Sequence, residues 1–159
     1  MVLGALEGSP AGVKSKYGGK VSYSPQCFKN DLCLFAAFNG HLAVLQWARA
    51  HGCTWDERTC MYAAEGGHLW VLQWARVHGC PWDESTCAYA AMNGHLEVLK
   101  WARAHGCPWD ESTCVNAAYA ANNGHLEVFK WARARGCPCS AATERIFARL
   151  SAESQGGPR

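Results

Sequence analysis

Apolar residues recur at helical spacing in paired runs, which are clearest in residues 85–92 and 95–105. Asp83 stands before the first run as a good N-cap residue, since its carboxylate can accept hydrogen bonds from the free amides of a first helical turn. Asn93 and Gly94 end that run, and Gly106 followed by Pro108 ends the second. The pattern predicts two short helices that are joined by a tight turn and followed by a short connector.

The same arrangement recurs along the chain with a nearly fixed period. Gly-His-Leu begins at Gly40, Gly67, Gly94 and Gly124, in steps of 27, 27 and 30 residues. Trp-Ala-Arg and Gly-Cys follow in the same order each time. One helix pair alone could not bury its apolar surface, whereas stacked pairs form a continuous core. We therefore expect an all-α solenoid of right-stacked helix-turn-helix repeats.

The domain organisation follows from where the period begins and ends. We expect the solenoid to cover residues 26–153, with about four helix pairs and a C-terminal capping helix, and its first helix to start near Asp31. Segments 1–25 and 154–159 lack the pattern and are expected to be disordered. A tryptophan in each second helix is expected to stack from unit to unit: Trp47, Trp74, Trp101 and Trp131.

The stretch from Ser85 to Trp109 resembles an ankyrin repeat. The resemblance rests on Ala90-Ala91, on Gly94-His95-Leu96 and on the closing Gly106, and it extends over about residues 31–150. It implies a module for binding other proteins. The period of 27 residues is shorter than the ~33 of that family. The missing part is the projecting β-hairpin, so we expect little or no β-structure and a binding surface of helices and short loops.

Composition narrows the classes of function. A net charge of +2 gives no reason to expect nucleic acid or a membrane surface as a partner, and no apolar run is long enough to cross a bilayer. Ten cysteines occur without the features of a secretory signal at the N-terminus. We therefore expect reduced thiols and an intracellular location, in the cytoplasm or, as an alternative, in the nucleus. We also expect the protein to be a monomer.

The cysteines and histidines also permit a different function, that of a metal-binding or thiol-redox protein. Zinc needs four converging ligands, and no Cys-x-x-Cys pair is present. Buried cysteines that act as small apolar residues explain the pattern without a metal. The histidines at His41, His68, His95 and His125 are expected to cap turns, and the arginines at Arg49, Arg76, Arg103 and Arg133 to lie on a solvated outer face. No catalytic arrangement is evident, so we expect neither enzyme activity nor a cofactor.

Positions that differ between units are free to serve recognition. In ankyrin-like proteins the pair before each Gly-His lines the concave face, where an unknown protein partner would bind. Two features occur in one unit only. The second helix of the second unit has an additional aromatic residue, and the first helix of the fourth unit has three additional residues. The candidate partner-binding residues are Phe38, Asn39, Arg58, Glu65, Trp70, Met92, Asn93, Tyr119, Asn122 and Asn123. A purely structural spacer is the remaining alternative.

Overall fold

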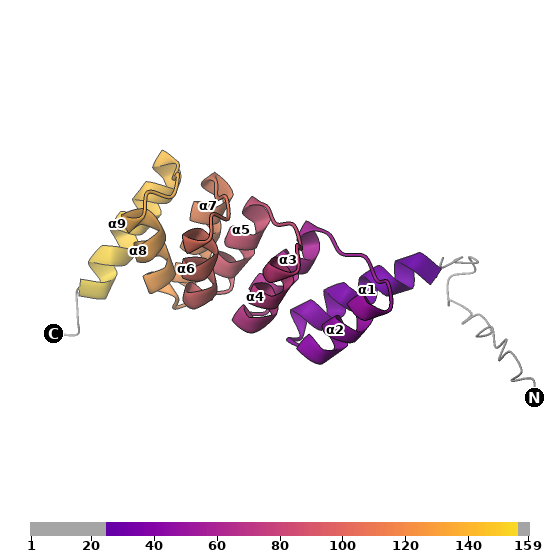
Figure 1. Cartoon of the computed structure of the whole chain (residues 1–159). Helices are drawn as coiled ribbons and strands as arrows, with labels where there is room; N and C mark the ends of the chain where they lie inside the picture. The colour runs from indigo at the N-terminus through magenta and orange to yellow at the C-terminus, as the bar shows by residue number, and fades with distance from the viewer. Residues whose placement is uncertain (1–24, 156–159) are drawn as a thin grey trace, which may run out of the picture.

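The structure is a computed structural model that describes residues 25–155, with side chains from 31 to 152. Within this part the chain forms helices and no strands, as expected for an all-α helical repeat solenoid. The helices are α1 Pro25–Phe38, α2 Leu42–Ala50, α3 Glu57–Glu65, α4 Leu69–Val77, α5 Glu84–Met92, α6 Leu96–Ala104, α7 Glu111–Asn122, α8 Leu126–Ala134 and α9 Ala141–Gln155. Figure 1 shows them as consecutive pairs in a single row.

The boundaries differ from the sequence prediction at both ends. Helix α1 begins at Pro25 and not near Asp31, and α9 runs two residues past the expected end at 153, to Gln155. Apart from these residues, the segments expected to be disordered, 1–25 and 154–159, lie outside the described residues.

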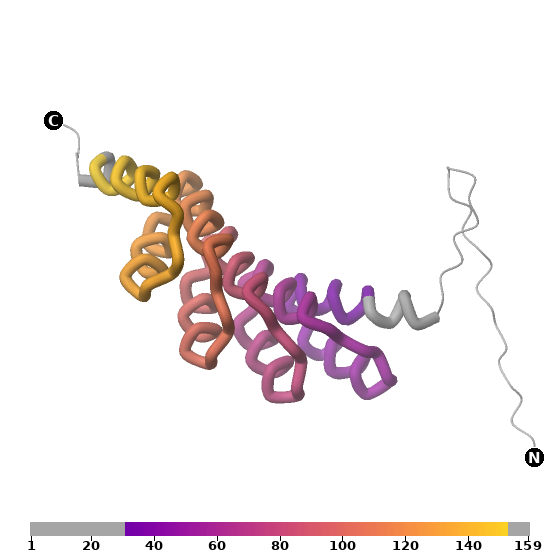
Figure 2. Tube along the Cα trace, turned by 90° about the horizontal axis from the view of Figure 1, so that it is seen from above, coloured from indigo at the N-terminus to yellow at the C-terminus, as the bar shows by residue number. Residues whose placement is uncertain are grey.

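The helices form two layers. The first helices α1, α3, α5 and α7 pack against one another in order, and α9 continues their layer against α7. Each second helix packs chiefly on its own first helix, and Figure 2 shows the second helices spread apart along the other side of the row. The first-helix layer is therefore the inner side of the solenoid.

Small residues in the first helices allow this close packing. Ala63, Ala64, Ala90 and Ala91 are completely buried between neighbouring units. Second helices contribute larger side chains to the same core, of which Leu45, Leu72, Leu99 and Phe129 are fully buried. One core thus runs through all units, because each pair covers the apolar surface of the next.

The aspartate N-cap that the sequence predicts at Asp83 is present, and it recurs in two other units. Asp56, Asp83 and Asp110 are N-caps of α3, α5 and α7, and each carboxylate accepts a hydrogen bond from the amide two residues later. The three additional residues of the fourth unit lengthen α7 to 12 residues, against 9 in α3 and α5. Helix α7 therefore projects by nearly one further turn.

Candidate functional site

The tryptophans join neighbouring units in a way the sequence prediction missed. They do not stack on their own equivalents. Trp101 of α6 meets Trp82 of the connector before α5 edge to face, with ring centroids 6.0 Å apart. The Arg76 guanidinium lies 4.0 Å from the Trp82 centroid, and His105 stacks on the other tryptophan at 4.2 Å. We call this arrangement the aromatic stack.

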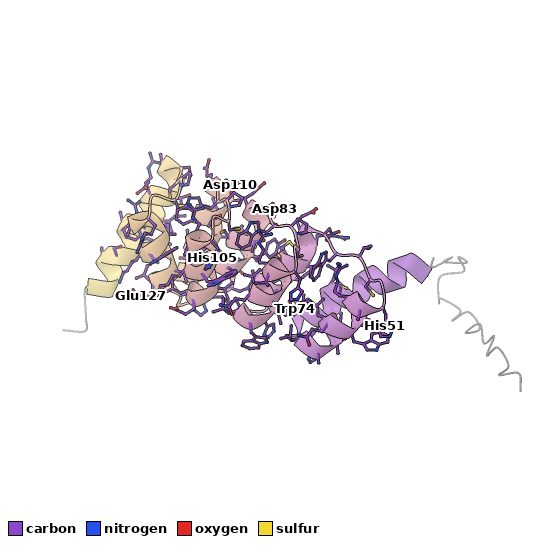
Figure 3. The ribbon with its side chains drawn as sticks, in the orientation of Figure 1. His51, Trp74, Asp83, His105, Asp110 and Glu127 are labelled. Atoms are coloured by element: carbon purple, nitrogen blue, oxygen red, sulfur yellow. A yellow bond between two sulfur atoms is a disulfide. The ribbon has the colours of Figure 1, made fainter. Side chains whose placement is uncertain are left out.

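The aromatic stack recurs at three joints, and the tryptophan pair and the arginine keep nearly the same geometry at each. Its members are Arg49, Trp55, Trp74 and His78 at the first joint, Arg76, Trp82, Trp101 and His105 at the second, and Arg103, Trp109, Trp131 and Arg135 at the third. Figure 3 shows Trp74 and His105 on the second-helix side, away from the capping residues Asp83 and Asp110. Trp47 has no connector tryptophan before it and is 56% exposed.

The arginine column is structural, which corrects the expectation of a solvated outer face. Arg49, Arg76 and Arg103 are half-buried. Each donates a hydrogen bond through Nη1 to the carbonyl of the connector cysteine four residues later and lies over a connector tryptophan. Cation–π contact of this kind stabilises the joint.

Three of the four histidines before the second helices act between units: His68, His95 and His125. None of them makes a side-chain hydrogen bond that caps its own helix. The ring of His95 lies against Gly67 of the preceding unit, and its Nε2 is 3.0 Å from the Glu65 carbonyl oxygen. Burial lowers the pKa of His95, so its ring is held neutral. His68 and His125 lie in the same way against Gly40 and Gly94, so these three histidines cover a turn of the preceding unit.

Most described cysteines are buried thiols. The Sγ atoms of Cys80 and Cys107 donate to the carbonyls of the N-cap aspartates of the preceding unit, at 3.4 and 3.3 Å. Contact with a neighbouring thiol together with burial raises the pKa of Cys60 and Cys87, and burial raises the pKa of Cys137 to about 11. Thiols in this state are poor nucleophiles and poor metal ligands at neutral pH.

One pair departs from the expectation of reduced thiols. Cys114 of α7 and Cys139 form a disulfide, with Cα atoms 5.4 Å apart. Cys139 takes the connector position that Trp109 holds one unit earlier, and this replacement brings a second sulfur next to α7. Among the residues that the structure describes, no group of three or more His, Cys, Asp or Glu side chains is arranged to hold a metal ion.

Most of the predicted partner-binding residues gather at one edge of the inner layer. Phe38, Asn39, Glu65, Met92, Asn93, Asn122 and Asn123 close the first helices of successive units. All of these except the half-buried Glu65 are exposed. Arg58 lies at the opposite end of α3, where it forms an ion pair with Asp56 at 2.8 Å, and Trp70 lies on the second helix α4 with 54% of its surface exposed.

The asparagines of this edge also have a structural role. The side-chain amides of Asn39, Asn93 and Asn123 donate to the carbonyl four residues earlier, at 2.9, 3.2 and 3.3 Å. The carbonyls of Phe35 and Tyr89 also accept the backbone amide of the same asparagine, so the side chain adds a second hydrogen bond at the end of the helix. Their conformations are thus fixed before any partner binds.

The predicted partner-binding residue Tyr119 belongs to an aromatic row along the inner layer, and the row as a whole was missed from the sequence. Every first helix carries an aromatic residue six positions before its Gly-His histidine: Phe35, Tyr62, Tyr89 and Tyr119. An alignment of the units on this histidine would have shown the row. An alignment on the N-cap residue hides it, because Tyr119 then falls among the three additional residues of the fourth unit. Phe35 and Tyr119 are 60% and 55% exposed, and the two tyrosines between them are half-buried.

The aromatic row is hollowed at its N-terminal end. Phe38 packs edge to face on Tyr62, with ring centroids 6.1 Å apart, between α1 and α3. A cavity of about 310 Å³ opens there, lined by Asp31, Leu34, Phe35, Phe38 and Tyr62. This volume lies at the lower end of the range of ordinary ligand pockets.

Comparison with protein-family models and with curated proteins found no match for this chain. None of the helices within residues 25–155 is both long and apolar enough to pass through a bilayer.

Proposed function

We propose that the chain is an ankyrin-type recognition module and that it binds a partner protein through the inner faces of its first helices. One observation supports this most directly. Large apolar side chains stand exposed along the inner layer, at 60% for Phe35, 44% for Phe38, 37% for Met92 and 55% for Tyr119. Exposed aromatic residues grouped on one face are typical of protein interaction sites.

The dimensions of the face favour a protein ligand. Packed helices lie about 8–10 Å apart, so the aromatic row from α1 to α7 extends over about 30 Å. A helix of about 20 residues has the same length. A stable complex needs about 1,000 Å² of total buried surface, which such a segment provides.

The proposal assigns binding and no catalytic activity to the module, and it needs no cofactor. Its recognition elements are helix ends and turns in place of a β-hairpin. The variable residues Glu65, Met92 and Asn122 give each unit a different side chain at the same place, which is how a repeated scaffold can recognise a non-repeated partner.

The experiment is affinity capture with the purified chain and with two matched variants. In Phe35→Ser/Tyr119→Ser, a partner bound at the inner face should be retained at least about tenfold less, because truncation of an interface anchor costs 1–2 kcal/mol or more. Val77→Ser is the control, since Val77 is 82% exposed but lies at the end of the second helix α4.

Equal retention by both variants and by the parent chain would contradict the assignment of the inner face. Capture of nothing by the parent chain would favour a structural spacer. A second set of variants, Met92→Ala/Asn122→Ala/Asn123→Ala, tests the predicted edge of the same face, and unchanged binding would exclude that edge.

A further inference from the structure

A second concave site lies on the opposite side of the solenoid, between α6 and α8. It is a cavity of about 430 Å³, lined by Lys100, Arg103, Ala104, Trp109, Trp131 and Arg135. Two indole rings meet edge to face in it, with centroids 6.1 Å apart. The volume lies within the range of ordinary ligand pockets. None of these residues belongs to the inner face, so this site does not depend on the function proposed above.

The repeat supplies an internal comparison for this pocket. The joint one unit earlier, between α4 and α6, has the same plan, with Gln73, Arg76, Val77, Trp82, Trp101 and His105 at the equivalent places. The arginine lies 4.0 Å from its tryptophan centroid there and 4.1 Å here, so the two joints share one framework.

Three positions distinguish the pocket from that earlier joint, and two of the changes add positive charge. Lys100 stands where the earlier joint has Gln73, and Arg135 stands where it has His105, while Ala104 stands in place of the larger Val77. Together with Arg103, three cationic side chains surround the two indoles. The framework needs only the arginine, so the two further cations are not required for folding.

The three cationic side chains differ in how strongly they already interact with other groups of the protein. Arg103 is occupied by the Cys107 carbonyl and the Trp109 ring. Lys100 pairs with Glu97 at 2.8 Å, and both side chains are exposed, so this ion pair is weak. Arg135 is exposed and lies 5.7 Å from the Trp131 centroid, farther than the 4.2 Å of the corresponding His105 stack.

We propose that this pocket binds an acidic peptide segment of a partner protein, in which an aromatic residue stands beside carboxylates. The guanidinium of Arg135 and the ammonium of Lys100 bind the carboxylates through charge-assisted hydrogen bonds. The aromatic ring of the peptide packs on the indoles of Trp109 and Trp131. The earlier joints keep the indoles but lack the two added cations, so they do not bind this ligand.

The test uses a fluorescein-labelled dodecapeptide of repeated Glu-Phe-Glu and a control peptide with Lys in place of Glu. Fluorescence anisotropy should show binding of the acidic peptide only, with affinity that falls as salt is raised. The variant Lys100→Gln/Arg135→His should bind about tenfold more weakly. It introduces the two polar side chains that the preceding joint carries at these places, so its thermal unfolding should match that of the parent chain.

The reverse graft makes the test sharper. Gln73→Lys/Val77→Ala/His105→Arg should create a second pocket between α4 and α6 and raise the stoichiometry from one peptide to two. The inner-face variant Phe35→Ser/Tyr119→Ser should bind the peptide unchanged, so that a failure of one proposal is separate from a failure of the other.

Three results would overturn the proposal. The acidic and basic peptides could bind alike or not at all, or the Lys100→Gln/Arg135→His variant could keep full affinity. The third is tighter binding of a single-stranded oligonucleotide than of the acidic peptide, with loss of the oligonucleotide in the same variant, which would assign the pocket to nucleic acid.

Discussion

Gly67, in the turn between α3 and α4, tests how the units are held together. Its φ is +74°, and a Cβ atom added there would lie 2.6 Å from the ring of His95 in the next unit. Gly67→Ala therefore introduces two costs. A left-handed conformation costs an L-residue about 1–2 kcal/mol. The methyl group also overpacks the contact between the units, which costs about 1–3 kcal/mol more.

Gly79 provides a matched control one half-unit later. Its φ is +81°, so Gly79→Ala carries the same conformational cost, but a Cβ atom there meets nothing within 4 Å. We expect the free energy of unfolding to fall by about 1–2 kcal/mol in Gly79→Ala. The fall in Gly67→Ala should be larger by the overpacking cost of about 1–3 kcal/mol.

Urea titration followed by circular dichroism at 222 nm measures both values. The double variant Gly67→Ala/His95→Ala completes a double-mutant cycle, and removal of the ring should return most of the additional loss. Equal destabilisation by the two glycine substitutions, or a coupling energy near zero between Gly67 and His95, would refute the packing of the histidine ring on the preceding turn.

Three further predictions concern the caps, the disulfide and the pH dependence of stability. Asp83→Ala should lower the free energy of unfolding by about 1 kcal/mol through loss of the N-cap of α5, and Glu84→Ala, which keeps the cap, should lose less in the same urea titration. Reduction of the Cys114–Cys139 disulfide, which spans 25 residues, should lower the free energy of unfolding by about 3 kcal/mol and release two titratable thiols; an unchanged thiol count would contradict the pairing. Because burial lowers the pKa of His95 below 6.5, the unfolded chain takes up a proton that the folded chain excludes, so the free energy of unfolding should decline between pH 7 and pH 5.5; an equally steep decline in His95→Gln would contradict this.

The repeat architecture could be predicted from the sequence because its determinants are local. Asp83 caps a helix through an amide two residues away, and the turn at Asn93-Gly94 joins two helices that follow each other directly. The period then requires that neighbouring pairs stack. These features depend on residues close in sequence, so they are visible without coordinates.

Contacts between units could not be predicted in the same way. The sequence shows that Arg76, Trp82 and Trp101 recur, but it does not show that the connector tryptophan lies between the other two side chains. The candidate site shows the same limit. The exposed edge at Met92 was found from variation between units. The aromatic row that begins at Phe35 was missed because the insertion in α7 shifts Tyr119 out of register with Tyr62 and Tyr89 when the units are counted from their N-caps.

The aromatic stack makes the joints between units interchangeable. Arg49 and Trp55 present the same surface to the unit that follows them as Arg76 and Trp82 present to the next unit. Deletion of residues 57–83 would bring Trp101 to the place of Trp74. Trp101 would then pack on Trp55 as Trp74 does now, so the two units that become neighbours would fit together. The array can therefore gain or lose whole modules of 27 residues while its end segments stay the same, so that its reach can change by recombination without a redesigned core.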